Sequence, residues 1–129
     1  MDKVVGNLRI LFHILILLLI IISLYPGSIL GFIIYGDLGS QPKLTRNFFY
    51  ISSNHLYVYF FISTIGFFSY INDRKFKLIF LYLFFLSIML EALHAVIPLR
   101  SFQIEDLVGN ILGVLTAYII VLIYKFWKK

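Results

Sequence analysis

The sequence contains no cysteine, and only 13% of its 129 residues are charged. Soluble domains have about 25% charged residues. Without cysteine the chain forms neither a disulfide framework nor a thiolate metal site. Apolar residues make up 61% of the chain, and the mean hydropathy is +0.97. This composition excludes a disordered tail and most soluble enzymes, because a globule of this size cannot bury so much apolar surface. The sequence therefore predicts a membrane protein.

Four segments are long and apolar enough to cross a bilayer, which requires roughly 20 mainly apolar residues, with a range of about 17–25. They are residues 8–24, 55–71, 76–97 and 107–124. We therefore predict an all-α polytopic membrane protein with a single domain over residues 1–129. The first segment ends at Tyr25-Pro26-Gly27 without a small-residue cleavage site, so we expect a retained helix rather than a signal peptide.

The positive charges predict the orientation of these helices. If both termini are cytoplasmic, eight of the 11 lysines and arginines lie inside, and Lys43, Arg46 and Arg100 lie outside. Cytoplasmic loops carry an excess of lysine and arginine, so this distribution favours N-in, C-in. The net charge of +5 is then a signal of topology, and we expect a lipid bilayer and no nucleic acid as partner.

The segment from Pro26 to Asn54 is long for a loop of so small a protein. Its first part, S-I-L-G-F-I-I-Y-G, is apolar but too short to span. We predict an interfacial or re-entrant segment here, with an apolar loop over the helix ends as the alternative. Aromatic residues next to it are predicted to form a belt at the outer interface, namely Phe48, Phe49, Tyr50, Tyr57 and Tyr59.

Polar residues gather where the second, third and fourth predicted helices meet the outer leaflet. Ionisable groups inside a membrane cost roughly 2.5–3.5 kcal/mol each on insertion scales and usually mark function. Residues three or four apart share one face of a helix. We therefore expect one outward-facing site from His55, Glu91, His94, Arg100, Asp106 and Asn110.

Several of these residues also have purely structural interpretations. Asp106 can cap the fourth helix. Arg100 can extend to lipid headgroups or form an ion pair with Glu91. Asn110 is expected to bond to a neighbouring helix, and His55 can be an inert interfacial residue.

Small residues on the fourth segment predict a close helix contact. Gly109 and Gly113 form a G-x-x-x-G motif that Ala117 continues. We expect this contact within the bundle rather than in a dimer, since Asn110 lies beside it.

Three chemistries fit the polar residues. Glu91 and His94 have the E-x-x-H spacing of carboxylate-bridged metal sites, so a divalent metal there, completed by Asp106, Glu105 or His55, is one alternative. His55 or His94 is a candidate for an acid–base pair with Glu91, but no nucleophile is evident. Arg100 is suited to a bidentate contact with a phosphate or carboxylate. An anionic lipid-linked group without a cofactor is the leading expectation.

The stretch E-A-L-H-A-V-I-P-L-R-S-F-Q-I-E-D-L-V-G-N-I-L-G resembles the VanZ-like family of small bacterial membrane proteins. The matching residues are Glu91, Pro98, Arg100, Asp106, Asn110 and Gly113, together with His55, Tyr59 and Phe60 upstream. The resemblance covers residues 55–124. The chain departs from the family pattern at Ile51 and Ser52, where the family often has Asp-Lys, and at His94, where glutamine is usual.

The resemblance implies a multi-pass protein of the bacterial cytoplasmic (inner) membrane. The name-giving member of the family is associated with resistance to the glycopeptide teicoplanin. We therefore expect an envelope protein that affects glycopeptide susceptibility or surface polymer assembly by binding a lipid-linked cell-wall precursor or another envelope protein. The expected ligand-binding residues are Arg100, Glu91, Asp106, His94 and Asn110, and the expected packing residues are Gly109, Gly113 and Pro98. The alternatives are a membrane-embedded hydrolase or transferase that uses His55 and Glu91, and a purely structural scaffold.

Overall fold

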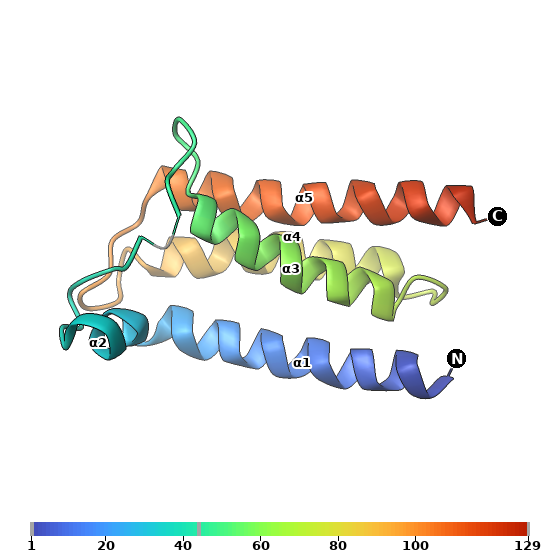
Figure 1. Ribbon diagram of the computed structural model, residues 1–129, viewed down its shortest axis with the longest axis horizontal. Helices are drawn as coiled ribbons and strands as arrows, with labels where there is room; N and C mark the ends of the chain where they lie inside the picture. The colour runs from blue at the N-terminus through green and yellow to red at the C-terminus, as the bar shows by residue number, and fades with distance from the viewer. Residues whose placement is uncertain (1, 44, 129) are drawn as a thin grey trace.

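A computed structural model describes residues 2–43 and 45–128 of the chain. This part of the chain is α-helical, with an isolated β-bridge between Phe48 and Ile51 as its only β-pairing. Four long helices run side by side, and a short helix lies at one end (Figure 1). The predicted all-α class is confirmed. In chain order the helices are α1 (Asp2–Leu24), α2 (Ile29–Tyr35), α3 (Ser53–Ser69), α4 (Phe76–Leu93) and α5 (Ile104–Trp127).

Three of the helices are long and apolar enough to cross a membrane, namely α1 from Lys3 onward, α4 and α5. The sequence predicted four such spans. Helix α3 is the exception, because its 17 residues cover about 25 Å at 1.5 Å per residue. The hydrocarbon core of a bilayer is about 30 Å thick.

Helix α4 ends at Leu93, four residues before the predicted end at Ile97. The N–H groups of His94 and Ala95 bond to the carbonyls of Glu91 and Ala92, 3.1 and 3.2 Å away, so the last turn tightens. Pro98 follows and disfavours helical backbone in the residue before it. His94 therefore caps the helix instead of lying inside it.

The G-x-x-x-G motif lies at a close contact between α5 and α3. A Cβ atom on Gly109 would lie 2.5 Å from the carbonyl oxygen of Ser52, and one on Gly113 would lie 2.6 Å from that of Leu56. Ala117 continues this stripe and is fully buried. Only glycine allows the two backbones to approach this closely.

Both chain termini lie at one end of the bundle, and α2 lies at the other (Figure 1). At the end with the termini, Arg9 of α1 bonds to Asp73 in the α3–α4 turn through Nη2 and Oδ2, 2.7 Å apart. Its Nε also donates to the carbonyl of Ser69, 3.1 Å away. These contacts connect α1 to the rest of the bundle.

The outer surface of the long helices is apolar. Ile10 and Leu17 of α1 and Phe85 of α4 are more than half exposed. Such faces fit contact with lipid chains. The buried core includes Phe12, Phe67, Leu83 and Val114.

Tyr59 belongs to this core, with only 3% of its surface exposed. Its predicted place in an interfacial aromatic belt is wrong, because α3 turns this side chain towards α5, where its Cβ lies near Gly113. The other predicted belt residues are exposed: Phe48, Phe49, Tyr50 and Tyr57.

The apolar segment after α1 folds into α2, a helix of seven residues. The Ser28 hydroxyl accepts the N–H of Gly31 at 2.9 Å, and Gly36, at φ 71°, ends the helix. Phe32 and Ile33 are mostly exposed. The segment is therefore a two-turn helix with exposed apolar side chains. A helix of this length is too short to cross a bilayer.

Candidate functional site

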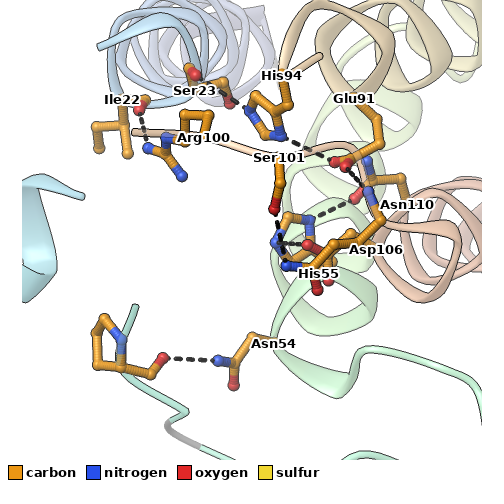
Figure 2. A network of polar contacts seen from close by, with 12 residues as sticks. Ile22, Ser23, Asn54, His55, Glu91, His94, Arg100, Ser101, Asp106 and Asn110 are labelled. Carbon is orange, nitrogen blue, oxygen red and sulfur yellow. Dashed lines mark hydrogen bonds and ion pairs between the residues drawn. The ribbon is translucent and has the colours of Figure 1, made fainter. Parts of the chain in front are cut away.

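A cavity of about 800 Å³ opens at the end of the bundle that carries α2. Its walls come from the end of α1, the segment before α3, the start of α3, the end of α4 and the start of α5. All six polar residues singled out in the sequence line this cavity: His55, Glu91, His94, Arg100, Asp106 and Asn110. Figure 2 shows them together.

Asn110 orients the imidazole of His55. The Nδ2 of Asn110 donates to the carbonyl of Ser87 in α4, 3.3 Å away, which leaves Oδ1 as the acceptor towards His55 Nδ1 at 2.9 Å. A carbonyl oxygen only accepts, so the proton of this bond belongs to Nδ1. The Nε2 atom of a neutral His55 then carries a free lone pair. As expected, Asn110 bonds to neighbouring helices, namely α3 and α4.

The Nε2 atom of His55 lies 3.5 Å from Oδ2 of Asp106 (Figure 2). Asp106 is in the first turn of α5, where a carboxylate complements the helix dipole. The side chain of Asp106 forms no cap hydrogen bond among the residues that the structure describes, and Gln103 occupies the N-cap position. The predicted capping role of Asp106 is therefore not seen.

Glu91 instead connects α4 to the beginning of α5. Its Oε1 accepts a hydrogen bond from the backbone N–H of Gln103, 3.0 Å away. Glu91 is fully buried, and its Oε2 has no hydrogen-bond partner within the described parts of the chain. The Nδ1 atom of His94 lies 3.2 Å from Oε2, a distance that suits an ion pair when His94 is protonated.

His94 also contacts α1. Its Nε2 lies 3.1 Å from the carbonyl oxygen of Ser23, which accepts the Nε2 proton. In a neutral imidazole the Nδ1 atom then carries no proton and cannot donate to Glu91. A hydrogen bond between Nδ1 of His94 and Oε2 of Glu91 therefore requires an additional proton on one of the two groups.

Arg100 is bound to the end of α1 and not to Glu91. Its Nη2 donates to the carbonyl of Ile22 at 2.8 Å, and its Nε makes a longer contact of 3.5 Å to that of Tyr25. The predicted Glu91–Arg100 ion pair is not formed in the described structure. Burial lowers the pKa of Arg100, although the charges of Glu91 and Asp106 oppose this shift. Arginine stays charged in proteins at neutral pH.

Pro98 completes this junction. Its carbonyl accepts the N–H of Gly27, 3.1 Å away, and thereby joins the segment after α4 to the end of α1. Gly27 has a φ of 82°, and a Cβ there would lie 2.6 Å from the carbonyl of Leu38. The turn after α1 therefore requires glycine.

Among the other lining residues, three contribute groups that the sequence did not mark as part of the site. Lys43 lines its exposed edge, and Gln103 and Ser52 supply main-chain groups. As a lysine in the long outer segment, Lys43 was recognisable as a candidate for anion binding. The main-chain contacts of Gln103 and Ser52 leave no pattern in the sequence, because every residue type offers these groups.

The structure brings together a different set of metal-ligating groups from the predicted Glu91–His94 pair. One ligand atom each from His55, Glu91 and Asp106 lie within 4.8 Å of one another. His94 is outside this group, although its Nδ1 is near Oε2 of Glu91. The two carboxylates and the imidazole come from three different helices.

Comparisons with protein-family models, curated proteins and solved structures find no match for this chain.

Proposed function

We propose that the protein is a four-span protein of the bacterial cytoplasmic membrane with both termini in the cytoplasm. The short α3 is the remaining span, because a bilayer can thin locally around a helix that is shorter than its hydrocarbon core. Helix α2 lies in the outer leaflet interface. Both termini lie at the same end of the bundle, as an even number of spans requires (Figure 1). The basic residues near Arg9, Lys75 and Lys125 then face the cytoplasm. The cavity faces the opposite, extracytoplasmic side.

The proposed ligand is the anionic head group of an envelope lipid, such as a lipid-linked cell-wall precursor. The observation that carries this proposal is the presence of Arg100 and Lys43 in one cavity beside the apolar helix α2. A lipid head group can enter the cavity while its chains remain against the exposed side chains of α2, such as Phe32 and Ile33.

The charges of the cavity favour binding near its exposed edge. Glu91 and Asp106 are buried and would repel an anion, whereas Lys43 is exposed and Arg100 is half-buried. The contacts of Arg100 to Ile22 and Tyr25 use Nη2 and Nε. The Nη1 group of Arg100 and the ammonium of Lys43 are the donors that we assign to the anion.

This activity agrees with the resemblance to VanZ-like proteins. A protein that holds a lipid-linked precursor would act on glycopeptide susceptibility of the teicoplanin type or on surface polymer assembly. The resemblance in residues 91–113 coincides with one wall of the cavity. The family's lysine position is Ser52 in this chain, and Lys43 lines the same cavity as Ser52.

The test measures retention of a polyprenyl phosphate by the purified protein in nanodiscs. We expect Lys43→Glu and Arg100→Lys to weaken binding about tenfold or more, since each removes a charge-assisted or bidentate contact. Arg74→Ala is the matched control, because Arg74 is exposed in the α3–α4 turn at the other end. Equal binding by the control and both cavity variants, with all three folded, would refute the proposal.

A membrane-embedded hydrolase or transferase is the second candidate function. Asn110 holds Nδ1 of His55 and leaves the lone pair of Nε2 free, 3.5 Å from Oδ2 of Asp106, which is the arrangement of a positioned general base. This alternative expects Glu91→Gln to abolish turnover of a lipid-linked substrate while the fold survives. If variants of Glu91, Arg100 and Asp106 instead lose activity only in proportion to protein level, the cavity residues form a structural scaffold.

A further inference from the structure

The geometry points to a divalent-cation site formed by His55, Glu91 and Asp106 in the buried part of the cavity. The site is separate from the proposed anion contacts at Arg100 and Lys43. It also differs from the E-x-x-H pair of Glu91 and His94, because the imidazole ligand comes from α3.

The spacing of the three groups fits a single ion. Their ligand atoms lie within 4.8 Å of one another, and His55 Nε2 is 3.5 Å from Asp106 Oδ2. Two ligands of a tetrahedral ion with bonds of about 2.1 Å are about 3.4 Å apart. Small side-chain adjustments of Glu91 therefore bring the three ligands to bonding distance.

The hydrogen bonds around His55 leave the correct nitrogen free. Asn110 accepts the Nδ1 proton, so the lone pair of Nε2 points towards Asp106. Histidine ligands of metals usually donate their second ring nitrogen to a carboxylate or carbonyl in this way. Asn110 is itself held by the Ser87 carbonyl, which makes it the positioning residue of the site.

The buried oxygen of Glu91 is the independent observation that indicates a ligand. Oε2 is fully shielded from solvent and has no hydrogen-bond partner in the described residues, although Glu91 lines the cavity. The Nδ1 atom of His94 lies 3.2 Å from Oε2, but it carries no proton when His94 is neutral, because the imidazole then donates to Ser23 through Nε2. Leaving a charged oxygen in this state is costly. A cation would satisfy this oxygen and reduce the repulsion between Glu91 and Asp106.

The donor set indicates the class of ion. One imidazole and two carboxylates suit Zn²⁺, Mn²⁺ or Fe²⁺, whereas Ca²⁺ and Mg²⁺ prefer oxygen ligands alone. Three protein ligands also leave a coordination position open towards the cavity, as in catalytic and ligand-binding metal sites. A phosphate or carboxylate oxygen is a suitable occupant of that position.

The test uses Zn²⁺ alone and is independent of the proposed lipid ligand. The full chain in detergent, stripped with a chelator, is titrated with Zn²⁺ by calorimetry, and bound metal is measured by mass spectrometry. We expect one equivalent of Zn²⁺, with affinity at least tenfold weaker in His55→Gln and Asp106→Asn. Asn110→Ala is expected to weaken binding by about 10-fold or more through loss of the positioning contact.

One matched control and one discriminating variant define the site. His13→Gln, near the other end of the bundle and bonded to Tyr70, is the control and should leave Zn²⁺ affinity unchanged. His94→Gln is the discriminating variant, because His94 contacts Glu91 without belonging to the ligand group, and it should weaken binding less than His55→Gln. If His94→Gln abolishes binding while His55→Gln does not, the ion lies between Glu91 and His94, and the proposed site is wrong.

X-ray absorption spectroscopy of the wild-type Zn²⁺ complex also tests the site. It needs no substitution, so a folding defect of a variant cannot affect the result. We expect nitrogen and oxygen ligands at about 2.0–2.2 Å and outer-shell scattering from one imidazole. Scattering from two imidazoles would overturn the assignment. Loss of the bound Zn²⁺ during dialysis would overturn it as well. A loss of Zn²⁺ binding without loss of polyprenyl phosphate binding, or the reverse, separates this inference from the proposed function.

Discussion

The carboxylate of Glu91, at the end of α4, accepts the backbone N–H of Gln103, 3.0 Å away, at the position where α5 begins. The side chain of one helix therefore satisfies a main-chain donor at the start of the next. This contact holds the two ends of the segment 94–103, from which Arg100 reaches α1. The carboxylate of Glu91 therefore stabilises the cavity and also belongs to the candidate site.

Replacing Glu91 should separate its structural and chemical contributions. Glu91→Ala leaves the Gln103 N–H without its partner, which costs about 1–3 kcal/mol of free energy of unfolding. Glu91→Gln retains an acceptor oxygen and should lose less. Denaturation in detergent measures both, and Glu105→Ala is the control in the same turn of α5. Equal stability of the Ala and Gln variants would show that the Gln103 contact contributes nothing.

The contact between α3 and α5 should tolerate no side chain at Gly113. A Cβ there would lie 2.6 Å from the Leu56 carbonyl and 2.9 Å from Tyr59 Cβ, so Gly113→Ala forces the helices apart. We expect a loss of about 1–3 kcal/mol in the free energy of unfolding. Gly6→Ala is the matched control, because nothing lies within 4 Å of a Cβ at that position of α1. Similar stability of both variants would contradict the close contact.

The α3–α4 turn should weaken in acid. The backbone N–H of Lys75 holds the pKa of Asp73 below its ordinary value, and Arg9 lowers it further. A lowered pKa in the folded state contributes stability above the ordinary pKa of about 3.9, which is lost as the pH falls through the folded value. Thermal unfolding between pH 7 and pH 3 should show this loss, and Asp73→Asn should reduce its slope. An unchanged slope in the variant would assign the acid sensitivity to other groups.

Parts of this structure followed from local sequence patterns, and others did not. The stripe of Gly109 and Gly113 was predictable because a four-residue spacing places both on one helix face. The grouping of His55, Glu91 and Asp106 was predictable because polar residues in apolar helices share their buried sides.

The partners of these residues were less predictable. Arg100 was expected to meet Glu91, yet it bonds to main-chain carbonyls of α1 that lie 75 and 78 residues away in the chain. Tyr59 was predicted to lie at the membrane interface because it is close to the start of the helix. Its side chain lies on the face of α3 that points into the core. The predicted segment 55–71 and helix α3 (Ser53–Ser69) have the same length of 17 residues. The segment was placed two residues too late in the chain, because apolar residues continue into the turn after Ser69.

The absence of cysteine makes the topology directly measurable. A single cysteine at Lys43 should react with a membrane-impermeant maleimide added to intact cells, whereas one at Lys75 should react only after permeabilisation. Both positions are exposed, so differences in reactivity report the side of the membrane. Labelling of the Lys75 position in intact cells, with Lys43 protected, would invert the orientation and place the cavity in the cytoplasm.

The two histidines of the cavity should adopt opposite tautomers when neutral. Asn110 Oδ1 requires the proton on Nδ1 of His55, and the Ser23 carbonyl requires it on Nε2 of His94. Nitrogen NMR of ¹⁵N-histidine-labelled protein distinguishes these forms, because protonated and unprotonated ring nitrogens differ strongly in chemical shift. Asn110→Ala removes the acceptor at His55 and should redistribute its proton between the two nitrogens, while His94 keeps its spectrum. An Nε2-protonated His55 in the unaltered protein would direct a proton rather than a lone pair at Asp106, and the free nitrogen on which the proposed cation site depends would be absent.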